Sequence, residues 1–265
     1  MGKVWQVILI ALFACSLPCL AEDLVVFHAG SLTKAMGEIA QAFTAETGLT
    51  VALVGAGSGS LRQRIEKGEK PDLFASADLE NPRALAAKDL AQAPTLFARN
   101  VQVLLARKSL GVTPANVIDK LLDPKLKLAT STPVMDPGGD YAWKLFDLVG
   151  AIRPGAAEQL KAKAIKLVGD PALPLPPKEY TKYQVSWHFD EGRADLFPSY
   201  LTSAKIVTSE LDYVEIVTLP ANLTVSAEYG LTEVNGARKD AARLRAFILG
   251  PKGQAILQGY GFSAP

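Results

Sequence analysis

The sequence has few of the side chains that bind transition metals or act as thiol nucleophiles. Its 265 residues include two cysteines and two histidines. Both cysteines, Cys15 and Cys19, lie within the first 21 residues. If this segment is removed, the remaining chain has no thiol, which excludes disulfides, thiol nucleophiles and cysteine metal sites. With His28 and His188 as the only histidines, we expect no site for a free metal cation.

The chain also lacks any long apolar run beyond its first 21 residues. These begin with Lys3, continue through the apolar stretch Val4–Leu17, and end with small residues, Cys19 and Ala21, at positions −3 and −1 of a signal-peptidase site. This pattern predicts a signal peptide over residues 1–21, too short to span a membrane. Because Pro18 is unsuitable before a lipidated Cys19, we expect an exported protein without a lipid anchor.

An excess of charge of either sign is likewise absent. The predicted signal peptide, called the leader below, holds one of the 28 basic residues, so the rest of the chain carries 27 basic and 27 acidic residues. A nucleic-acid-binding protein would need a basic face, so we expect no nucleic-acid partner. Net charge also offers no means of attracting anions. The remaining 244 residues are enough for one large domain or two lobes.

Apolar runs alternate with helical patterns along the chain. One helical face is predicted by Leu32, Ala35, Met36, Ile39 and Phe43. Such alternation predicts an α/β fold with a mainly parallel sheet that is covered on both faces. The segment 170–180 is rich in proline and predicts a stiff loop. The predicted strands are Leu24–Phe27, Leu49–Val54, Asp72–Ser76, Val101–Ala106, Lys127–Ala129, Leu196–Tyr200, Lys205–Val207 and Tyr213–Leu219.

Small and polar residues follow three of these strands, where a helix is about to begin. The first junction contains Gly30 and Ser31, the second is Gly55–Ser60, and the third is Asp136–Asp140 with its glycine pair. Such junctions meet at the carboxyl edge of a parallel sheet, where ligands bind. A helix N-terminus carries partial positive charge, and glycine lets a ligand approach its N–H groups. The three junctions therefore predict an anion site without Lys or Arg.

Hydroxyl and N–H donors suit a tetrahedral oxyanion that is fully ionised, because it offers only acceptors. Phosphate differs from such an ion, because it keeps a proton at neutral pH and needs an acceptor in the site. Alternatively, Ser31, Ser58 and Ser60 are ordinary N-caps, each stabilising its helix by about 1 kcal/mol. Recurrence of the pattern at the first two junctions, with a glycine pair at a later one, favours the oxyanion site.

Competing motifs are incomplete. In the stretch GAGSGS, Ser60 stands where a dinucleotide fingerprint has its third glycine, and the lysine of a phosphate-binding loop is missing. Ala56 and Ser60 also replace the glycines of a nucleophile elbow around Ser58. A secreted serine hydrolase using Ser58 is the alternative from another functional class. Since His28 and His188 lack partners in the sequence, we expect no catalysis.

Five stretches resemble the periplasmic molybdate-binding proteins of ABC importers and their archaeal molybdate/tungstate-binding relatives. They are FHAGSL, GAGSGSLRQRIEKGEKPDLFASAD, MDPGGDYAW, GRADLFPSYLTSA and GPKGQAILQGYGF. The resemblance covers essentially the whole chain after the leader. It implies a two-lobed periplasmic binding protein of type II, in which each lobe is a mainly parallel sheet flanked by helices. Crossing strands would join the lobes, which would close on the anion.

The resemblance also implies which residues hold the anion. Ser31 and Ser58 would each donate a hydroxyl and a backbone N–H. Gly138 would donate its backbone N–H, and Tyr200 its phenol from the second lobe. A further backbone donor falls at Lys182, at the start of the helix before the tyrosine. The molybdenum would be bound as molybdate by these same residues, with no cofactor and no separate metal ion.

An aspartate also falls within the matched motifs. Asp136 resembles the aspartate that completes an expanded shell around the metal in the archaeal proteins, but the accompanying glutamate is Ser199 here. An unpaired carboxylate would repel an anion, so we expect Asp136 to face away from the site.

The resulting hypothesis is a periplasmic protein that captures molybdate or tungstate for the membrane permease of an ABC transporter, and that is a monomer. The alternative is a binding protein for sulfate or another tetrahedral oxyanion. Lobe 1 is expected to comprise residues 22–100 together with 205–265, and lobe 2 residues 101–204.

Overall fold

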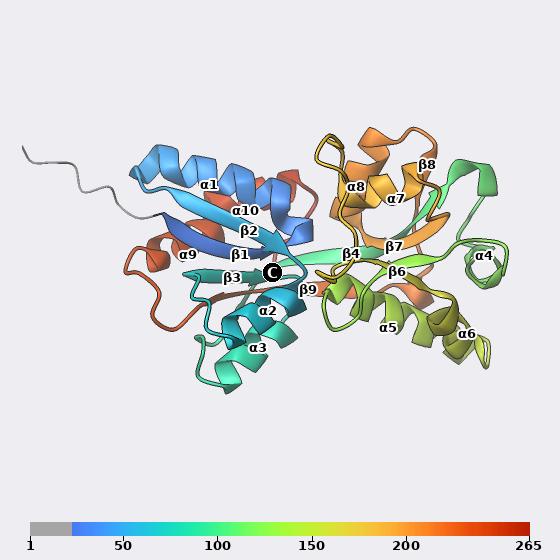
Figure 1. Cartoon of the computed structure of the whole chain (residues 1–265), viewed down its shortest axis with the longest axis horizontal. Coiled ribbons are helices and arrows are strands. Elements are labelled where there is room, and N and C mark those ends of the chain that lie inside the picture. The colour runs from blue at the N-terminus through green and yellow to red at the C-terminus, as the bar shows by residue number, and fades with distance from the viewer. Residues whose placement is uncertain (1–22) are drawn as a thin grey trace, which may run out of the picture.

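The computed structural model describes residues 23–265, so the signal peptide predicted over residues 1–21 lies outside the described part. Two halves lie side by side along the long axis of the molecule (Figure 1). Each half contains a sheet with helices on both faces. No helix within residues 23–265 is long and apolar enough to cross a membrane.

The first half is built on strands that begin the chain. Strands β1 and β2 pair in parallel, and β1 pairs with β3 in parallel on its other side. The helices α1, α9 and α10 cover one face and α2 and α3 the other (Figure 1). The bounds are β1 Leu24–Ala29, η1 Gly30–Leu32, α1 Thr33–Thr47, β2 Val51–Ala56, α2 Ser58–Glu66, β3 Leu73–Ser76, α3 Glu80–Ala87, α9 Ala241–Leu249 and α10 Pro251–Gly259.

The second half repeats this plan with its own sheet. Strands β5 and β6 pair in parallel, and a parallel bridge from Leu128 to Leu196 continues the sheet to β7. Helices α5 and α6 lie on one face, and α7 and α8 on the other (Figure 1). The bounds are η2 Lys108–Leu110, α4 Val117–Leu122, β5 Ala129–Ser131, α5 Pro137–Ile152, α6 Ala156–Lys163, β6 Ile165–Val168, α7 Gln184–Asp190, β7 Leu196–Tyr200, α8 Leu201–Glu210, β8 Val214–Val217 and η3 Ala221–Leu223.

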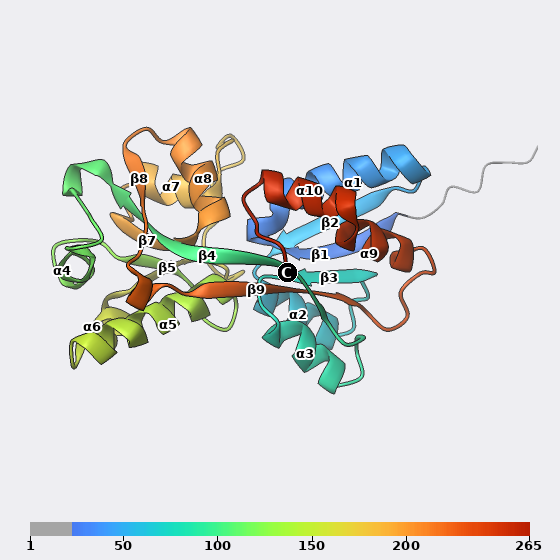
Figure 2. The ribbon, with the colours of Figure 1, turned by 180° about the vertical axis from the view of Figure 1, so that it is seen from behind.

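Two long strands, β4 (Thr95–Arg107) and β9 (Ser226–Glu233), run from one half into the other (Figure 2). The first part of β4 pairs with β9, and its second part pairs with β7 and β8. The sequence predicted only Val101–Ala106 of β4 and did not predict β9. The polar pair Arg99 and Asn100 interrupts the apolar run of β4 just where the strand passes between the halves.

The predicted α/β class with mainly parallel sheets is confirmed. In the first half, β1, β2 and β3 run together and β9 is antiparallel to β3. In the second half, β5, β6 and β7 run together and β4 is antiparallel to β7. Because the parallel strands share one direction in each half, their carboxyl ends point to a common edge where helices begin.

The strand predicted at Lys205–Val207 is wrong, because these residues lie within α8. The β-branched pair Ile206 and Val207 suggested a strand. However, Ala204, Val207 and Leu211 are buried at helical spacing, and tertiary packing of that face decides the outcome. The lobe boundary expected at residue 205 also falls inside α8, which packs on β4, β7 and β8. The chain leaves the second half along β9.

Candidate ligand-binding site

A cavity of about 410 Å³ lies between the two halves. The first half lines it with residues at the starts of η1 and α2, and the second half with residues at the starts of α5, α7 and α8. These helix starts follow β1, β2, β5 and β7, or the loop after β6. The cavity therefore forms where the carboxyl edges of the two sheets face each other.

The charges around this cavity are unusual for an anion site. Among residues 23–265 no lysine or arginine lines it, whereas two carboxyl side chains, Asp136 and Asp170, do. The positive ends of the surrounding helices are the attractive elements, since their first N–H groups have no partner inside the helix. The lining is thus a mixture of positive helix ends and carboxyl groups, and not the donor-only surface that the sequence suggested.

Ser31 lines the cavity and is held by a tyrosine of β9. Its Oγ lies 2.9 Å from the Tyr229 Oη. The Asn100 side-chain amide donates to the same Oη at 3.4 Å, and also to Thr202 Oγ1 at 2.8 Å. Burial raises the pKa of Tyr229 far above its usual value, so the phenol stays protonated. This network fixes the first junction against both crossing strands.

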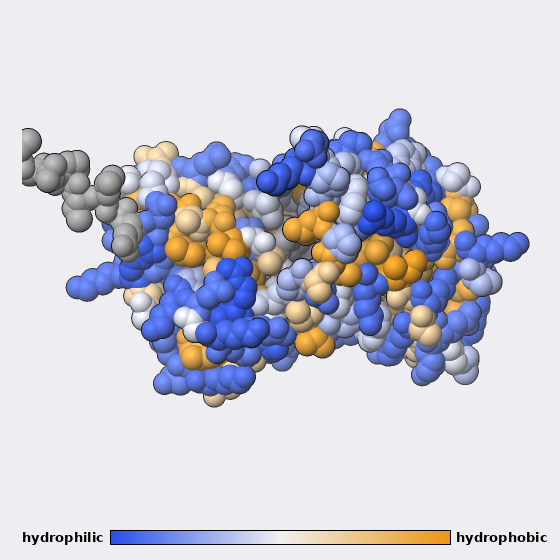
Figure 3. Space-filling model, viewed as in Figure 1, coloured by the Kyte–Doolittle hydropathy of each residue, from blue (hydrophilic) through white to orange (hydrophobic). Residues whose placement is uncertain are grey.

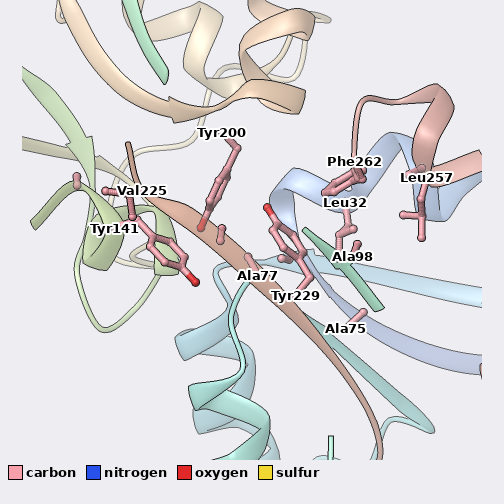
Figure 4. Packing of buried hydrophobic residues seen from close by; sticks show 14 of the residues in the cluster. Leu32, Ala75, Ala77, Ala98, Tyr141, Tyr200, Val225, Tyr229, Leu257 and Phe262 are labelled. Atoms are coloured by element: carbon pink, nitrogen blue, oxygen red, sulfur yellow. The ribbon is translucent and has the colours of Figure 1, made fainter. Parts of the chain in front are cut away.

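Tyr200 brings an unpaired hydroxyl to the cavity from the second half. The residue is 7% exposed, and within residues 23–265 its Oη has no hydrogen-bond partner. Its ring packs edge-on between Tyr141 and Tyr229, with centroids 5.9 Å and 5.7 Å away (Figure 4). Burial raises the pKa of Tyr200 well above its usual value. The group is therefore a protonated donor held in one direction at the edge of the cavity.

The structure places the two serines of the second junction differently from the sequence analysis, which proposed Ser58 as an anion donor and considered Ser60 only as an N-cap. Ser58 does not line the cavity, because its fully buried Oγ accepts the Ala77 N–H at 3.1 Å. Ser60 does line it, and makes contacts across to the second half. Its N–H donates to the Met135 carbonyl at 3.1 Å, and its Oγ to the Gly169 carbonyl at 3.0 Å. The two halves therefore touch at the start of α2.

Glycine is required at this contact. A Cβ on Gly59 would overlap the carbonyl oxygen of Val134, and one on Gly57 would overlap that of Met135. The nearest atoms to the Gly59 position all belong to Val134 and Met135 of the second half. The small residues of the second junction thus allow the halves to approach each other, as well as leaving the helix start open.

Asp136 lines the cavity, so the expectation that it faces away is wrong. It is the N-cap of α5, and its Oδ1 accepts the Gly138 N–H at 2.9 Å. Gly138 also borders the cavity, but this N–H is engaged within the protein. Burial raises the pKa of Asp136 to about 6, against the lowering effect of the Gly138 and Ser131 hydrogen bonds. Loss of the negative charge is thus easier here than for an ordinary carboxyl group.

Lys182 lies outside the cavity, and its ammonium pairs with Asp190 at 3.1 Å. The next residues along the chain, Tyr183, Gln184 and Val185, border the cavity instead. The Tyr183 N–H donates to the Glu210 carboxylate at 2.9 Å, and α7 begins at Gln184. The helix start implied by the resemblance is present, displaced by two residues along the chain.

Several polar residues of the lining were not predicted. Ser199 and Ser203 flank Tyr200 within the same quoted stretch, and Ser131 ends β5, so the junction argument could have found all three. Gln102 projects from the middle of β4, and nothing in the neighbouring sequence indicates that it would line a cavity.

His28 does not line the cavity. It is buried against Gly55, and its Nδ1 lies 2.9 Å from the Ala29 carbonyl oxygen.

Comparisons with known proteins agree with this architecture. Residues 24–263 match the model of a family described as bacterial extracellular solute-binding protein, and the chain belongs to that family. The uncharacterized protein PM1146 of Pasteurella multocida is 34% identical over 89% of this chain and 97% of its own. The molybdate-binding protein ModA of Escherichia coli is 26% identical over 95% of this chain and 93% of its own.

Similarity also extends to solved structures. The sulfate-binding protein SubI of Mycobacterium tuberculosis superimposes with a TM-score of 0.76, covering 92% of this chain and 87% of its own, at 17% identity. At that identity the likeness concerns the fold alone. The family membership makes this protein an extracellular solute-binding protein and not an enzyme.

Proposed function

We propose that this protein captures a tetrahedral oxyanion in the periplasm, molybdate or tungstate in the first place, and delivers it to the permease of an ABC importer. The observation that carries the proposal is the buried, unpaired Oη of Tyr200 in a cavity bordered by helix starts. A buried donor without a partner is destabilising by about 1–3 kcal/mol, and an anionic acceptor would remove that penalty. The cavity is therefore arranged to receive acceptor atoms.

The donors in this proposal come from both halves. Ser31 and Tyr200 donate hydroxyls, and each such hydrogen bond to an anion contributes about 1.5–3 kcal/mol. Ser58 is not among these donors, because it lies outside the cavity and its hydroxyl accepts the Ala77 N–H. At α5, an anion competes with the Asp136 carboxylate for the Gly138 N–H. In place of Lys182, the helix-start donors are Gln184 and Val185 of α7.

The choice of molybdate rests on the sequence relative ModA, which is matched over nearly its full length. Sulfate is the second candidate, because hydroxyl and N–H donors serve both ions and a sulfate-binding protein shares the fold. Calorimetry of the protein without residues 1–21 against molybdate, tungstate and sulfate tests the choice. We expect molybdate and tungstate to bind at least tenfold tighter than sulfate. Tighter binding of sulfate would replace the first candidate by the second.

The proposed partner is a membrane permease, and we expect the binding protein to be a monomer. Both expectations can be measured directly. Light scattering of the protein with and without the oxyanion gives the oligomeric state. Transport assays in membranes that contain the permease test whether only the oxyanion-loaded protein stimulates uptake. A dimer in the first measurement would contradict the monomer expectation and leave the binding proposal unaffected.

A further inference from the structure

The cavity is larger than a bare tetrahedral ion requires. If each of four oxygens takes the space of one water, about 30 Å³, such an ion occupies roughly 120 Å³. The cavity measures about 410 Å³, which lies within the range of pockets for organic molecules. The halves already touch where Ser60 meets Met135 and Gly169, so at that edge they have no room to close further. Most of the space remains after a bare ion is placed.

The part of the lining that belongs to the second half is suited to an organic group. Apolar side chains line it from the end of β6, the proline-rich loop, the start of α7 and the strand β7. Leu175 of that loop is 74% exposed although it is apolar and borders the cavity. Apolar surface also appears along the boundary between the halves, beside the loop that joins β6 to α7 (Figure 3). The apolar lining residues are Val168, Pro171, Leu175, Val185, Phe197 and Pro198.

The charges of the lining point to the chemistry of that organic group. Asp136 and Asp170 border the cavity, and in the described part of the chain no lysine or arginine lines it beside them. The Asp170 Oδ1 accepts only a local N–H, that of Ala172, at 2.8 Å. A ligand with two negative charges gains from the helix starts but is repelled by both carboxyl groups. A ligand that also carries an ammonium group would satisfy the carboxyl groups and the helix starts together.

We propose that the site also takes a zwitterionic organic oxyanion, namely a phosphonate or phosphate monoester whose short arm ends in an amine. The inference rests on the proposed oxyanion site, because the tetrahedral head occupies it near Tyr200 and Ser31. The methylene groups of the arm contact the apolar lining residues, and the amine lies between the carboxyl groups of Asp136 and Asp170. A phosphonate or phosphate ester that keeps one proton near neutral pH also finds an acceptor in Asp136, which a donor-only site would lack.

Matched ligands test this proposal. Calorimetry compares 2-aminoethylphosphonate with ethylphosphonate, which has the same head and an arm of similar length but no amine. Phosphoethanolamine, inorganic phosphate and molybdate complete the panel. We expect 2-aminoethylphosphonate to bind at least tenfold tighter than ethylphosphonate. If the two phosphonates bound with equal affinity while the protein bound molybdate in its own titration, the inference would be overturned and the oxyanion site would stand. Failure of every tetrahedral ion to bind would sink the proposed function together with the inference.

A variant adds a test in which the two ligands respond with opposite signs. Asp170→Asn keeps the acceptor for the Ala172 N–H but removes the charge. We expect this variant to bind 2-aminoethylphosphonate at least fivefold more weakly. It should bind ethylphosphonate slightly more tightly, because the repulsion between the phosphonate and the Asp170 carboxylate is lost. Asp119→Asn is the matched control, since Asp119 is an exposed carboxylate of α4 paired with Arg153 away from the cavity. If Asp170→Asn lowered the affinity for both phosphonates by the same factor, a contact between Asp170 and the ammonium group would be contradicted.

Discussion

The first half of the chain lines the cavity only with alanine, glycine, serine and threonine, whereas the second half lines it with tyrosines, carboxyl groups and larger apolar side chains. Small residues expose the backbone and the helix starts, so the first half offers a nearly uniform surface of donors. The second half supplies shape, acceptors and a phenol. This difference implies that general attraction of anions comes from the first half and selectivity from the second.

The largest expected effect comes from breaking the contact between the halves. In Gly59→Ala the new methyl group would overlap Val134, which lies in the other half. We expect oxyanion affinity to fall at least about 100-fold and the melting temperature to fall as well, because the halves already touch at this position without ligand and the clash moves them apart. Calorimetry and thermal unfolding measure both. Gly37→Ala in α1, where a Cβ meets nothing within 4 Å, should leave affinity unchanged.

The second prediction concerns the carboxyl group that the second half places in the cavity. Burial raises the folded-state pKa of Asp136 from 3.8 to about 6. The stability that results from this raised pKa is fully present below pH 3.8 and is lost as the pH rises through 6. Asp136→Asn should therefore be more stable than wild type at pH 8 by up to about 3 kcal/mol, and this difference should disappear below pH 3.8. Urea unfolding across this range measures it, and a pH-independent difference would refute the assignment.

The third effect isolates the phenol that faces the cavity. Tyr200→Phe removes a donor that has no partner in the ligand-free protein. We expect oxyanion affinity to fall by about 1.5–3 kcal/mol, roughly tenfold or more, with stability unchanged or slightly raised. Tyr141→Phe is the control, because its ring packs on Tyr200 but does not line the same cavity. If Tyr200→Phe and Tyr141→Phe bound the oxyanion with equal affinity, the Tyr200 hydroxyl would not contact the ligand.

The smallest effects separate two serines of the first half. Ser31→Ala should weaken oxyanion binding several-fold, with little change in stability, because Ser31 lines the cavity. Ser58→Ala should act mainly on stability, lowering it by about 1–3 kcal/mol, since the buried Ala77 N–H loses its acceptor. Binding and urea unfolding of both variants give the comparison. If Ser58→Ala weakened binding more than Ser31→Ala, the positions of the two hydroxyls would be reversed from those proposed.

Much of the fold followed from periodicity in the sequence. The strand β7 was predicted with its observed bounds, and β1 and β3 to within two residues at each end. Local patterns sufficed there because each strand is a short apolar run bounded by turn residues. The crossing strand β9 was not predicted, since its polar residues interrupt the apolar run. The segment at Lys205–Val207 was predicted as a strand because β-branched residues outweighed the helical spacing of its buried face.

The candidate site was predicted less completely than the fold. The sequence pointed to Ser31, Gly138 and Tyr200, and the structure places all of them on the cavity. It also pointed to Ser58 and Lys182, which lie outside it. Ser58 and Ser60 are two residues apart and so point in directions about 200° apart around the helix axis, and the choice of which serine faces the other half depends on how α2 packs. Side-chain direction at a helix start is set by contacts with distant segments, which the local sequence does not contain.

The sequence by itself determined that glycine and serine end the strands of the first half, because this composition is a local property that exposes helix starts to a ligand. It determined equally that no net charge and no cysteine chemistry would attract the ligand once the leader is removed. Only the tertiary structure decided that Asp136 and Asp170 border the same space as Tyr200. These residues lie far apart in the chain, and the size and charge of the cavity arise from the approach of two halves along β4 and β9.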